Sequence, residues 1–589
     1  MQTPKEFYTH QVNSLTIELA TAKKQLLQLS LFRFLVFLVS IALLVFWVKG
    51  NTVLGIIGIL LLGGFVFLVL KHQNKQKEKK IAEAKLDLNQ TELKVLDKDF
   101  KQLPTGDEFL NPQHFFSHDI DLFGRSSFFQ YLNRTATKAG KQLLADTLTS
   151  NNTENITKKQ EALQDLAPKV KWRQHFSALA TTLQNDKEVN TVVEELKNYV
   201  PQLPSFASIL TIVFSILSIV IFGAVCFGII PFSILIIWFF VGLFVSGIFF
   251  KRTNELYNKA GKSKSVFNQY HQLIAEIEQE NFTSEILVTK QKETQTNAQK
   301  ASAILKDFSK ILDAFDQRNN VVIAVFGNAF FLWEIRNALK TEKWIAKHKN
   351  TVEKWFDVVA FFDAYNSLAN FVYNHPNYVF PVVQEETSII KGEELGHPLL
   401  KEAKRIDNNF NIDKEEFFIV TGANMAGKST FLRTVSLSIV MANCGLPVCA
   451  SDFKYSPTKL ITSMRTTDSL SEDESYFYSE LKRLKFIVDE IKEENYFIIL
   501  DEILKGTNST DKAEGSKKFV EKLTQSKSTG IIATHDVSLC ELASEYPEVK
   551  NYFFDAYIAD NELTFDYLLK AGVCKNRNAS FLLQKMEIV

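Results

Sequence analysis

Residues 421–430 read TGANMAGKST and fit the pattern of a phosphate-binding loop, G-x-x-x-x-G-K-[ST]. The glycines of such a loop let backbone N–H groups point inward and cradle phosphates. The stretch 415–422 predicts a buried strand before the loop, and 429–445 predicts a helix after it, whose N-terminal dipole favours phosphate. A chance match is the alternative, and the flanking strand and helix argue against it.

The loop also predicts how a nucleoside triphosphate is held. We expect Lys428 to reach the β- and γ-phosphates and to act in catalysis, and Ser429 to bind Mg²⁺. The other nucleotide-binding residues of this prediction are Gly422, Ala423, Asn424, Met425, Ala426, Gly427 and Thr430. The predicted cofactors are therefore ATP and Mg²⁺.

Two further strand ends carry candidate catalytic side chains. The stretch YFIILDE (496–502) predicts a strand ending in Asp501, which can bind Mg²⁺, and Glu502, which can orient and polarise the attacking water. The stretch GIIATHD (530–536) predicts a third strand with His535 at its end, where a side chain could touch the γ-phosphate. A solvated turn and a structural histidine are the alternatives, and the upstream loop favours the catalytic interpretation.

Four blocks in this order resemble the MutS family of DNA mismatch-repair ATPases. They are the phosphate loop, SMRTTDSLSEDESYFYSEL (463–481), ILDEILKGTNSTDKAEG (499–515) and ATHD (533–536). The resemblance implies an ABC-like ATPase head that works as a homodimer, with Ser475 as the signature serine that reaches the nucleotide of the other subunit. The loop that crosses the dimer seam would be formed by Asn508, Ser509, Thr510 and Asp511.

The chain departs from the family pattern before and within the core. About a hundred residues precede the first core-like segment at 118–148, which leaves no room for a mismatch-reading domain. A second core-like segment follows at 320–344. The expected place of the DNA clamp between them is taken by an uncharged stretch from Asn198 to Phe250. The resemblance therefore implies DNA, whereas these departures count against mismatch discrimination.

Two departures concern the nucleotide site itself. Asp473 and Glu474 precede Ser475, where the family usually has a glycine and a basic residue, and carboxylates repel a γ-phosphate unless they face away or pair with a cation. Arg405 falls where the family often has an aromatic side chain that stacks on the adenine. A planar guanidinium can stack in the same way.

Four apolar stretches are long enough to cross a membrane, and we expect them to form two hairpins. They are residues 31–48, 52–70, 206–230 and 232–250. Buried core helices are the alternative. The basic flanks of both pairs lie on one side, so the positive-inside rule predicts an integral protein of the inner or plasma membrane with its N-terminus, core and ATPase head in the cytoplasm.

Composition adds two limits. The chain has 67 basic and 67 acidic residues, so its net charge lends no support to binding through phosphate neutralisation. Its five cysteines form no C-x-x-C pair, which argues against a metal site or a disulfide framework.

The predicted fold class is multidomain, with an α-helical core or lever domain, four transmembrane helices and a C-terminal α/β P-loop ATPase domain of ABC-like type. The expected segments are an N-terminal cytoplasmic helix (1–30), transmembrane hairpin 1 (31–72), the first core helices (73–200), transmembrane hairpin 2 (201–250), the second core or lever helices (251–385) and the ATPase domain (386–589). The stretches 77–103 and 257–318 are expected to form long amphipathic helices.

Two functions fit these features. The first is a membrane-anchored, dimeric MutS-like ATPase whose turnover is coupled to DNA. The second is an ATP-driven conformational machine or scaffold that acts on a membrane partner without DNA. The expected partners are a second copy through the ATPase heads, membrane lipid, DNA, and an unidentified membrane or repair protein.

Overall fold

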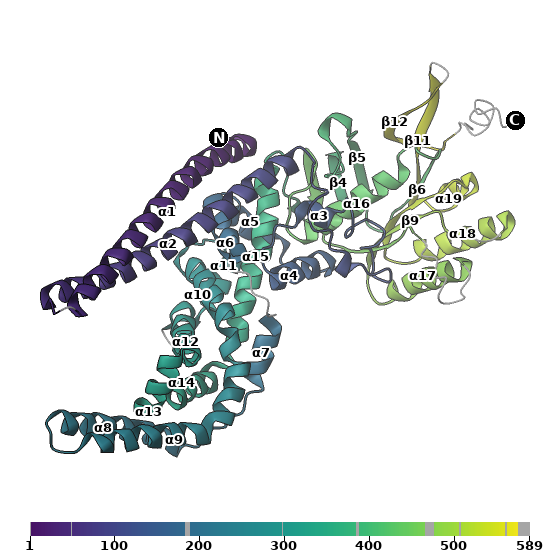
Figure 1. The fold of residues 1–589 in the computed structure, drawn as a ribbon. Coiled ribbons are helices and arrows are strands. Elements are labelled where there is room, and N and C mark those ends of the chain that lie inside the picture. The colour runs from purple at the N-terminus through teal and green to yellow at the C-terminus, as the bar shows by residue number, and fades with distance from the viewer. Residues whose placement is uncertain are drawn as a thin grey trace.

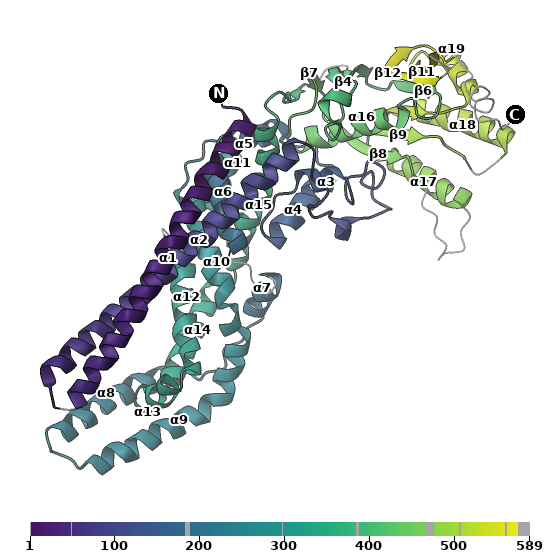
Figure 2. The same cartoon turned by 45° about the horizontal axis from the view of Figure 1, so that its top comes forward.

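The computed structural model describes residues 2–48, 50–182, 189–296, 299–384, 388–465, 476–505, 508–559 and 562–574. Two pairs of apolar helices stand at one end, a helical body lies in the middle, and an α/β head lies at the other end (Figure 1). Both pairs point away from the head in the second view as well (Figure 2). This arrangement confirms the predicted division into a helical N-terminal region with four apolar helices and a C-terminal α/β region.

Hairpin 1 consists of α1 (Pro4–Val48) and α2 (Thr52–Leu96), each 45 residues long. Asn51 caps α2 by accepting a hydrogen bond from the N–H of Leu54 at 3.3 Å. The stretch 77–103 was expected to be helical, and it is so as far as Leu96, as the continuation of α2. The reason is that no glycine or proline interrupts the sequence after the apolar part of α2.

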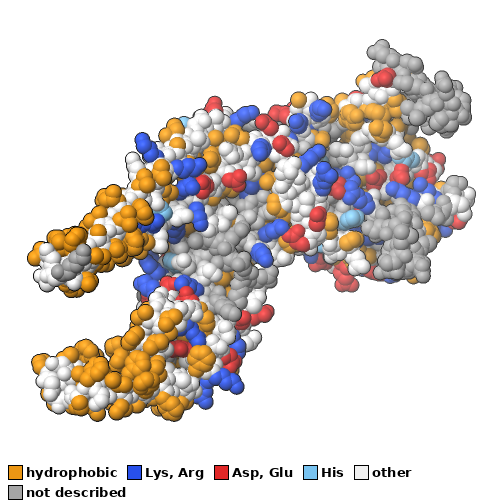
Figure 3. Space-filling view, in the orientation of Figure 1, with side chains coloured by type: hydrophobic (Ala, Val, Ile, Leu, Met, Phe, Trp, Pro, Cys, Tyr) orange, Lys and Arg blue, Asp and Glu red, His pale blue; other side chains and the backbone are white. Residues whose placement is uncertain are grey.

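Hairpin 2 consists of α8 (Phe206–Cys226) and α9 (Phe232–Lys259). The indole of Trp238 stacks on Phe214 at 4.5 Å and donates a hydrogen bond to Ser218 at 2.7 Å, which ties the two helices together. All four hairpin helices are long and apolar enough to cross a membrane. Apolar side chains gather at the ends of both hairpins that lie away from the head in the space-filling view (Figure 3).

The helical body is built from short and medium helices around α15 (Val352–Asn374), most of whose residues are buried. The others are α3 (Phe128–Leu132), α4 (Lys138–Thr149), α5 (Ile156–Leu166), α6 (Val170–Thr182), α7 (Val189–Lys197), α10 (Lys264–Gln279), α11 (Glu285–Lys292), α12 (Ala301–Asp316), α13 (Asn328–Phe331) and α14 (Trp333–His348). The stretch 257–318 is mostly helical, as expected, and is divided among the end of α9 and the helices α10, α11 and α12. Single 3-10 turns and the two-residue strands β1 (Gln295–Thr296) and β2 (Gln299–Lys300) separate them.

Buried polar contacts hold hairpin 1 and the N-terminal helices to α15. Glu92 of α2 pairs with Arg134 at 2.5 Å and accepts a hydrogen bond from Asn374 at 2.7 Å. The hydroxyl of Tyr8 in α1 donates to the same Asn374 at 2.7 Å. These groups are desolvated, so each needs its partner, and the cluster fixes where hairpin 1 meets the body.

The head contains a six-stranded sheet in the order β12-β11-β6-β10-β9-β8. Its strands are β6 (Phe417–Gly422), β8 (Lys459–Ser463), β9 (Tyr496–Asp501), β10 (Thr529–Ala533), β11 (Val549–Ala559) and β12 (Glu562–Ala571). All neighbours are parallel except β11 and β12. The helices are α16 (Lys428–Asn443), α17 (Tyr476–Glu490), α18 (Ser509–Thr524) and the short α19 (Leu542–Glu545). A second sheet has the order β3-β7-β4-β5, formed by Val382–Val383, Asp452–Tyr455, Ser388–Leu395 and Asn408–Asp413.

Candidate nucleotide site

The candidate site lies where three neighbouring parallel strands end. In the sheet, Ala533 of β10 pairs with Val420 of β6 on one side and with Asp501 of β9 on the other. The segments that follow these strands therefore meet at one edge, as expected for a ligand site in a parallel sheet. They border a cavity of about 490 Å³. It is lined by Ala423, Asn424, Met425, Gly427, Lys428, Ser429, Thr430, Asp501, Glu502, Lys505, His535 and Tyr567.

The phosphate loop is closed by Lys428, the first residue of α16. Its ammonium group donates hydrogen bonds to the carbonyl oxygens of Gly422 at 2.7 Å and Ala423 at 3.0 Å. Gly427, just before the helix, has φ of +109°, a conformation that side chains disfavour. Burial lowers the pKa of Lys428, although Asp501 and Glu502 lie close enough to raise it.

A hydroxyl and a carboxylate stand together beside the loop. Ser429 donates a hydrogen bond to Asp501 at 2.8 Å. Mg²⁺ is commonly held by one or two oxygen ligands from the protein together with water and phosphate oxygens, and this pair fits that pattern. Within the part of the chain that the structure describes, no group of three or more His, Cys, Asp or Glu side chains is arranged to hold a metal.

Glu502 and His535 both line the cavity and contact each other directly. Oε1 of Glu502 lies 2.8 Å from Nε2 of His535, which is also 3.3 Å from the Lys428 ammonium. Burial and the charge of Lys428 lower the pKa of His535, so the imidazole is neutral near pH 7. Burial would raise the pKa of Glu502, but Lys505 at 3.3 Å and His535 bring it below the usual value. Glu502 is thus a carboxylate at neutral pH, as a water-orienting base must be.

The backbone of the segment that carries Glu502 is strained, and a side chain of α17 holds it in place. Glu502 and Leu504 have φ of +51° and +57°, which is unfavourable for residues with side chains. The buried carboxylate of Glu480 in α17 accepts hydrogen bonds from the N–H groups of Leu504 at 2.5 Å and Lys505 at 3.0 Å. Glu480 lies within 463–481, one of the four blocks that resemble the MutS family, but the sequence alone did not indicate a role for it.

A second hollow of about 240 Å³ opens next to the phosphate loop. Its lining is mixed: it includes the apolar and aromatic side chains of Leu395, Ile406, Phe431, Phe554 and Tyr567 and the polar ones of His397, Lys404, Asn408, Thr430 and Thr434. Tyr567 also borders the main cavity, and a Cβ placed on Gly427 would lie 3.1 Å from its ring. Sequence reasoning missed Tyr567, since only the pairing of β12 at the sheet edge brings it to the loop.

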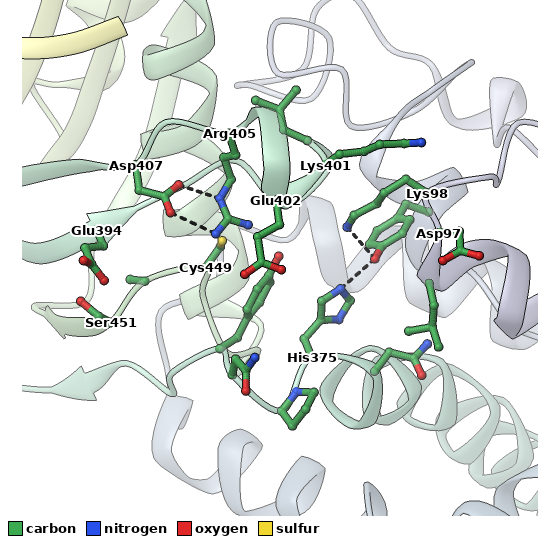
Figure 4. A pocket seen from close by; sticks show the side chains of 18 residues that line it. Asp97, Lys98, His375, Glu394, Lys401, Glu402, Arg405, Asp407, Cys449 and Ser451 are labelled. Atoms are coloured by element: carbon green, nitrogen blue, oxygen red, sulfur yellow. Dashed lines mark hydrogen bonds and ion pairs between the residues drawn. The ribbon is translucent and has the colours of Figure 1, made fainter. Parts of the chain in front are cut away.

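Arg405 does not line this hollow, contrary to the expectation that it stacks on an adenine. Its guanidinium is held by Asp407 at 2.6 and 3.0 Å and borders a separate cavity of about 630 Å³ between body and head (Figure 4). In this cavity Lys98 donates to the hydroxyl of Tyr131 at 2.8 Å, which lies 2.7 Å from Nε2 of His375. Burial lowers the pKa of Lys98 to about 8 and that of His375 to about 3.

The residues predicted to act across a dimer are described only in part. Ser475, with Asp473 and Glu474, lies outside the described residues, as does the side chain of Ser509. Thr510 is exposed. Asn508 caps α18: its side-chain oxygen accepts a hydrogen bond from the N–H of Asp511 at 2.9 Å, and its amide donates to the Asp511 carboxylate at 2.8 Å. Within one chain, Asn508 and Asp511 therefore start a helix, and any role across a dimer stays a prediction.

Comparison with known proteins places this head in a family. A family model, MutS domain V, matches residues 418–586. MutS protein homolog 4 of Homo sapiens is 28% identical over 246 residues, which are 40% of this chain and 26% of that protein. DNA mismatch repair protein MutS of Methanococcoides burtonii is 30% identical over 242 residues, 39% of this chain and 27% of that protein. The protein of the same name from Thermotoga maritima is 32% identical over 213 residues, 35% of this chain and 26% of that protein.

The match is confined to one part of each protein. The chain spans about a quarter of the length of these curated relatives. The family model covers β6, the phosphate loop, β9, β10 and the strands that end the head. The likeness to MutS proteins therefore lies in the α/β head, which matches MutS domain V.

Proposed function

We propose that this protein is a membrane-anchored ATPase of the MutS type. One observation carries the proposal: the ends of β6, β9 and β10 bring Lys428, the Ser429–Asp501 pair and the Glu502–His535 pair to a single cavity. A phosphate-binding lysine, a metal-binding pair and a water-orienting carboxylate are the parts that phosphoryl transfer to water needs. The similarity to MutS proteins supports the same reaction.

Each residue has a distinct part in this proposal. Lys428 turns from the loop carbonyls toward the β- and γ-phosphates and neutralises their charge. Ser429 and Asp501 would hold Mg²⁺, which supplies further charge neutralisation when bound. Glu502 orients and polarises a water molecule for direct attack, without a covalent intermediate. His535, next to Glu502, contacts the γ-phosphate.

The adenine fits best in the hollow beside the loop, whose lining includes aromatic side chains. This hollow adjoins Gly427 and Thr430, which also border the phosphate cavity, so one nucleotide can occupy both. Phe431 and Tyr567 offer aromatic surface for a base, and burying a flat base against such rings is favourable. We therefore assign the contact that was expected of Arg405 to these residues.

Nucleotide binding is tested with Lys428→Ala and a fluorescent ATP analogue. The variant is expected to lose tight binding because nothing else in the loop neutralises the terminal phosphates. Lys518→Ala removes an exposed lysine of α18 as the matched control and is expected to bind like the unaltered protein. Equal affinity for all three proteins would contradict the assignment of the loop.

The dimer and the membrane topology complete the proposal. As in the family resemblance, Ser475 and the 508–511 loop would meet the nucleotide of a second copy. Cysteines introduced at Ser475 and at the exposed Met425 should cross-link between subunits only with ATP. Hairpins 1 and 2 would span the inner or plasma membrane, with the basic flanks and the head on the cytoplasmic side.

Two outputs of the ATPase are considered. DNA is favoured by the similarity to relatives that are named DNA mismatch repair protein MutS. Work on the membrane is favoured by the place of hairpin 2, which occupies the end of the body far from the head (Figure 1). The two are separated by the ATPase rate with duplex, mismatched and branched DNA at low salt. A rate that differs among DNA structures supports the first, and a rate indifferent to every DNA supports the second.

A further inference from the structure

The segment 320–333 bends out of the helical body along the side of hairpin 2. It reads NVVIAVFGNAFFLW and has no charged residue. By sequence it resembles the start of later core helices. A core helix would bury its apolar side chains, but Val321, Val322, Phe326 and Phe331 are 75%, 64%, 55% and 40% exposed. Exposure of four large apolar side chains within one short segment indicates contact with a non-aqueous partner.

Both ends of the segment are held at one level of hairpin 2. Arg318, just before it, pairs with Glu334, just after it, at 3.1 Å, and both side chains are about 10% exposed. Thr253 of α9 donates a hydrogen bond to Glu334 at 2.6 Å. Thr253 directly follows Lys251 and Arg252, the basic residues expected at the membrane surface. The segment therefore begins and ends near Thr253 of α9.

Between its two ends the segment reaches far along α9. Ring contacts join Phe239 of α9 to Phe326 at 5.9 Å and to Phe330 at 5.8 Å. Gly242 lies so close to Ala329 that a Cβ on the glycine would come within 2.0 Å of the Ala329 carbonyl oxygen. Gly242 precedes Lys251 by nine residues, which is about 14 Å along a helix and close to half of a hydrocarbon layer of about 30 Å.

The reversal keeps its backbone paired, as a segment surrounded by lipid must. A π-helical turn over Ile323–Gly327 runs into α13, and Leu332 then adopts φ of +47° to start α14. Asn328 supports this bend from both sides. Its amide donates to the carbonyl of Ala324 at 2.9 Å, and its side-chain oxygen accepts from the N–H of Glu334 at 2.9 Å.

We propose that residues 320–333 form a re-entrant membrane segment, which enters the cytoplasmic leaflet beside hairpin 2, turns near the middle and leaves on the same side. Its partner is the acyl chains of that leaflet, because its exposed face continues the apolar surface of α8 and α9 and carries no group that another partner would recognise. The proposal rests on the membrane anchoring proposed above. It makes α14 a direct link between the bilayer and the body.

The depth of the segment is tested by spin labels on the full-length protein in lipid bilayers. The background carries Cys226→Ser and Cys574→Ser, which leaves three buried cysteines. Single cysteines are placed at Phe326, at Phe240 on the outer face of α9, and at Leu110 in a polar loop, which are 55%, 62% and 46% exposed. The label at Phe326 is expected to match that at Phe240, with high access to oxygen and several-fold lower access to a water-soluble nickel chelate than at Leu110.

Each other outcome separates the inference from the anchoring on which it rests. Access of the nickel chelate to Phe326 but not to Phe240 overturns the re-entrant segment and leaves hairpin 2 in the membrane. Access to both positions overturns the anchoring as well. Exclusion of both reagents from Phe326 means that protein, such as a second copy, covers this face, and the assignment to lipid is then wrong.

Re-entry, as opposed to crossing, is tested by sidedness. Cysteines at Lys310 and Lys340, both exposed, flank the segment on α12 and α14. In sealed proteoliposomes a membrane-impermeant maleimide should label the two positions to the same extent, with Leu110 reporting the orientation of the protein. Labelling of the two positions from opposite sides would show that the segment crosses the membrane and would overturn the inference.

Discussion

The head and the hairpin end of this molecule share one feature: a motif that is recognisable in the sequence is supported by residues from elsewhere in the chain. In the head, the sequence pattern predicts the phosphate loop and two carboxylates. Glu480 and Tyr567 support them, and the pattern does not predict these two residues. At the membrane end, two apolar hairpins are easily recognised, but the segment 320–333 that packs on hairpin 2 is not. In both regions the recognisable motif is local, and the residues that hold it come from elsewhere in the chain.

The two hairpins differ in how they join the body. Hairpin 1 meets the body along the second half of α2. Lys77 donates a hydrogen bond to Gln272 of α10, and Asn89 donates one to Gln174 of α6. Farther along, Glu92 pairs with Arg134. Hairpin 2 is rooted at Thr253 and Glu334, beside the basic residues at the membrane surface. Hairpin 1 is therefore joined to the body along the second half of α2, whereas the buried polar contact of hairpin 2 with the body lies at Thr253.

The largest effect is expected at the root of hairpin 2. Glu334→Ala leaves Arg318 buried without its partner, and breaking a buried pair in this way costs about 3–5 kcal/mol. Thermal unfolding in detergent measures the loss. Asp307→Ala removes a partner from the exposed pair with Lys310 and should cost no more than about 1 kcal/mol. Equal stability of the two variants would contradict this account, because the Arg318–Glu334 pair would then not stabilise the junction of hairpin 2 with the body.

In the head, the corresponding support is Glu480. Glu480→Gln keeps one acceptor oxygen for the N–H groups of Leu504 and Lys505 but removes the charge, so the strained Glu502 segment should lose its position. We expect kcat for ATP to fall about tenfold, an effect of about 1.4 kcal/mol, with little change in KM. Asp489→Asn, an exposed change on the same helix, should leave both constants unaltered. A rise in KM without loss of kcat would refute the positioning role.

A smaller effect is expected at Tyr567. Tyr567→Ala removes one aromatic wall of the hollow assigned to the adenine, which should weaken ATP binding about fivefold, or by about 1 kcal/mol. Tyr557→Ala, a change of similar exposure on the neighbouring strand β11, is the control. Binding curves for ATP and for inorganic triphosphate sharpen the test, since only ATP should respond. Equal weakening of both ligands would place Tyr567 at the phosphates.

The smallest effect concerns the joint between body and head. Burial lowers the pKa of His375 to about 3, while the unfolded chain takes up this proton near pH 6.5. Around and below pH 6.5 the unfolded state therefore binds more protons than the folded state. As the pH is lowered from 7.5 to 6, the free energy of unfolding decreases by about 1 kcal/mol. Chemical unfolding at several pH values should show a shallower decline for His375→Gln. An identical slope in both proteins would mean that His375 is accessible to protons when folded.

The sequence predicted the local parts of both regions. Lys428, Asp501, Glu502 and His535 lie together because their strands are apolar runs whose carboxyl ends meet in a parallel sheet, and such runs are visible in the sequence. The four apolar helices were visible for the same reason. The position of Tyr567 was not, since it depends on how β12 pairs at the sheet edge.

Other features depended on contacts that no short pattern records. Val321 and Phe326 belong to a run that reads like any buried helix. Only contacts with Phe239, Gly242 and Thr253 of α9 place the run against hairpin 2. Arg405 was expected at the adenine from its approximate position in the family pattern, but Asp407 two residues later holds its guanidinium elsewhere. Side-chain pairing of this kind is decided in three dimensions.

The most direct test of the account is the rate of ATP hydrolysis by Glu502→Gln in the full-length protein. The unaltered protein is expected to hydrolyse ATP. The variant should bind ATP but turn it over at least about 100-fold more slowly, because the amide cannot polarise the attacking water. Glu514→Gln, the same change at an exposed site, should be fully active. Hydrolysis by Glu502→Gln at the rate of the unaltered protein would contradict the assignment of this site as the catalytic centre.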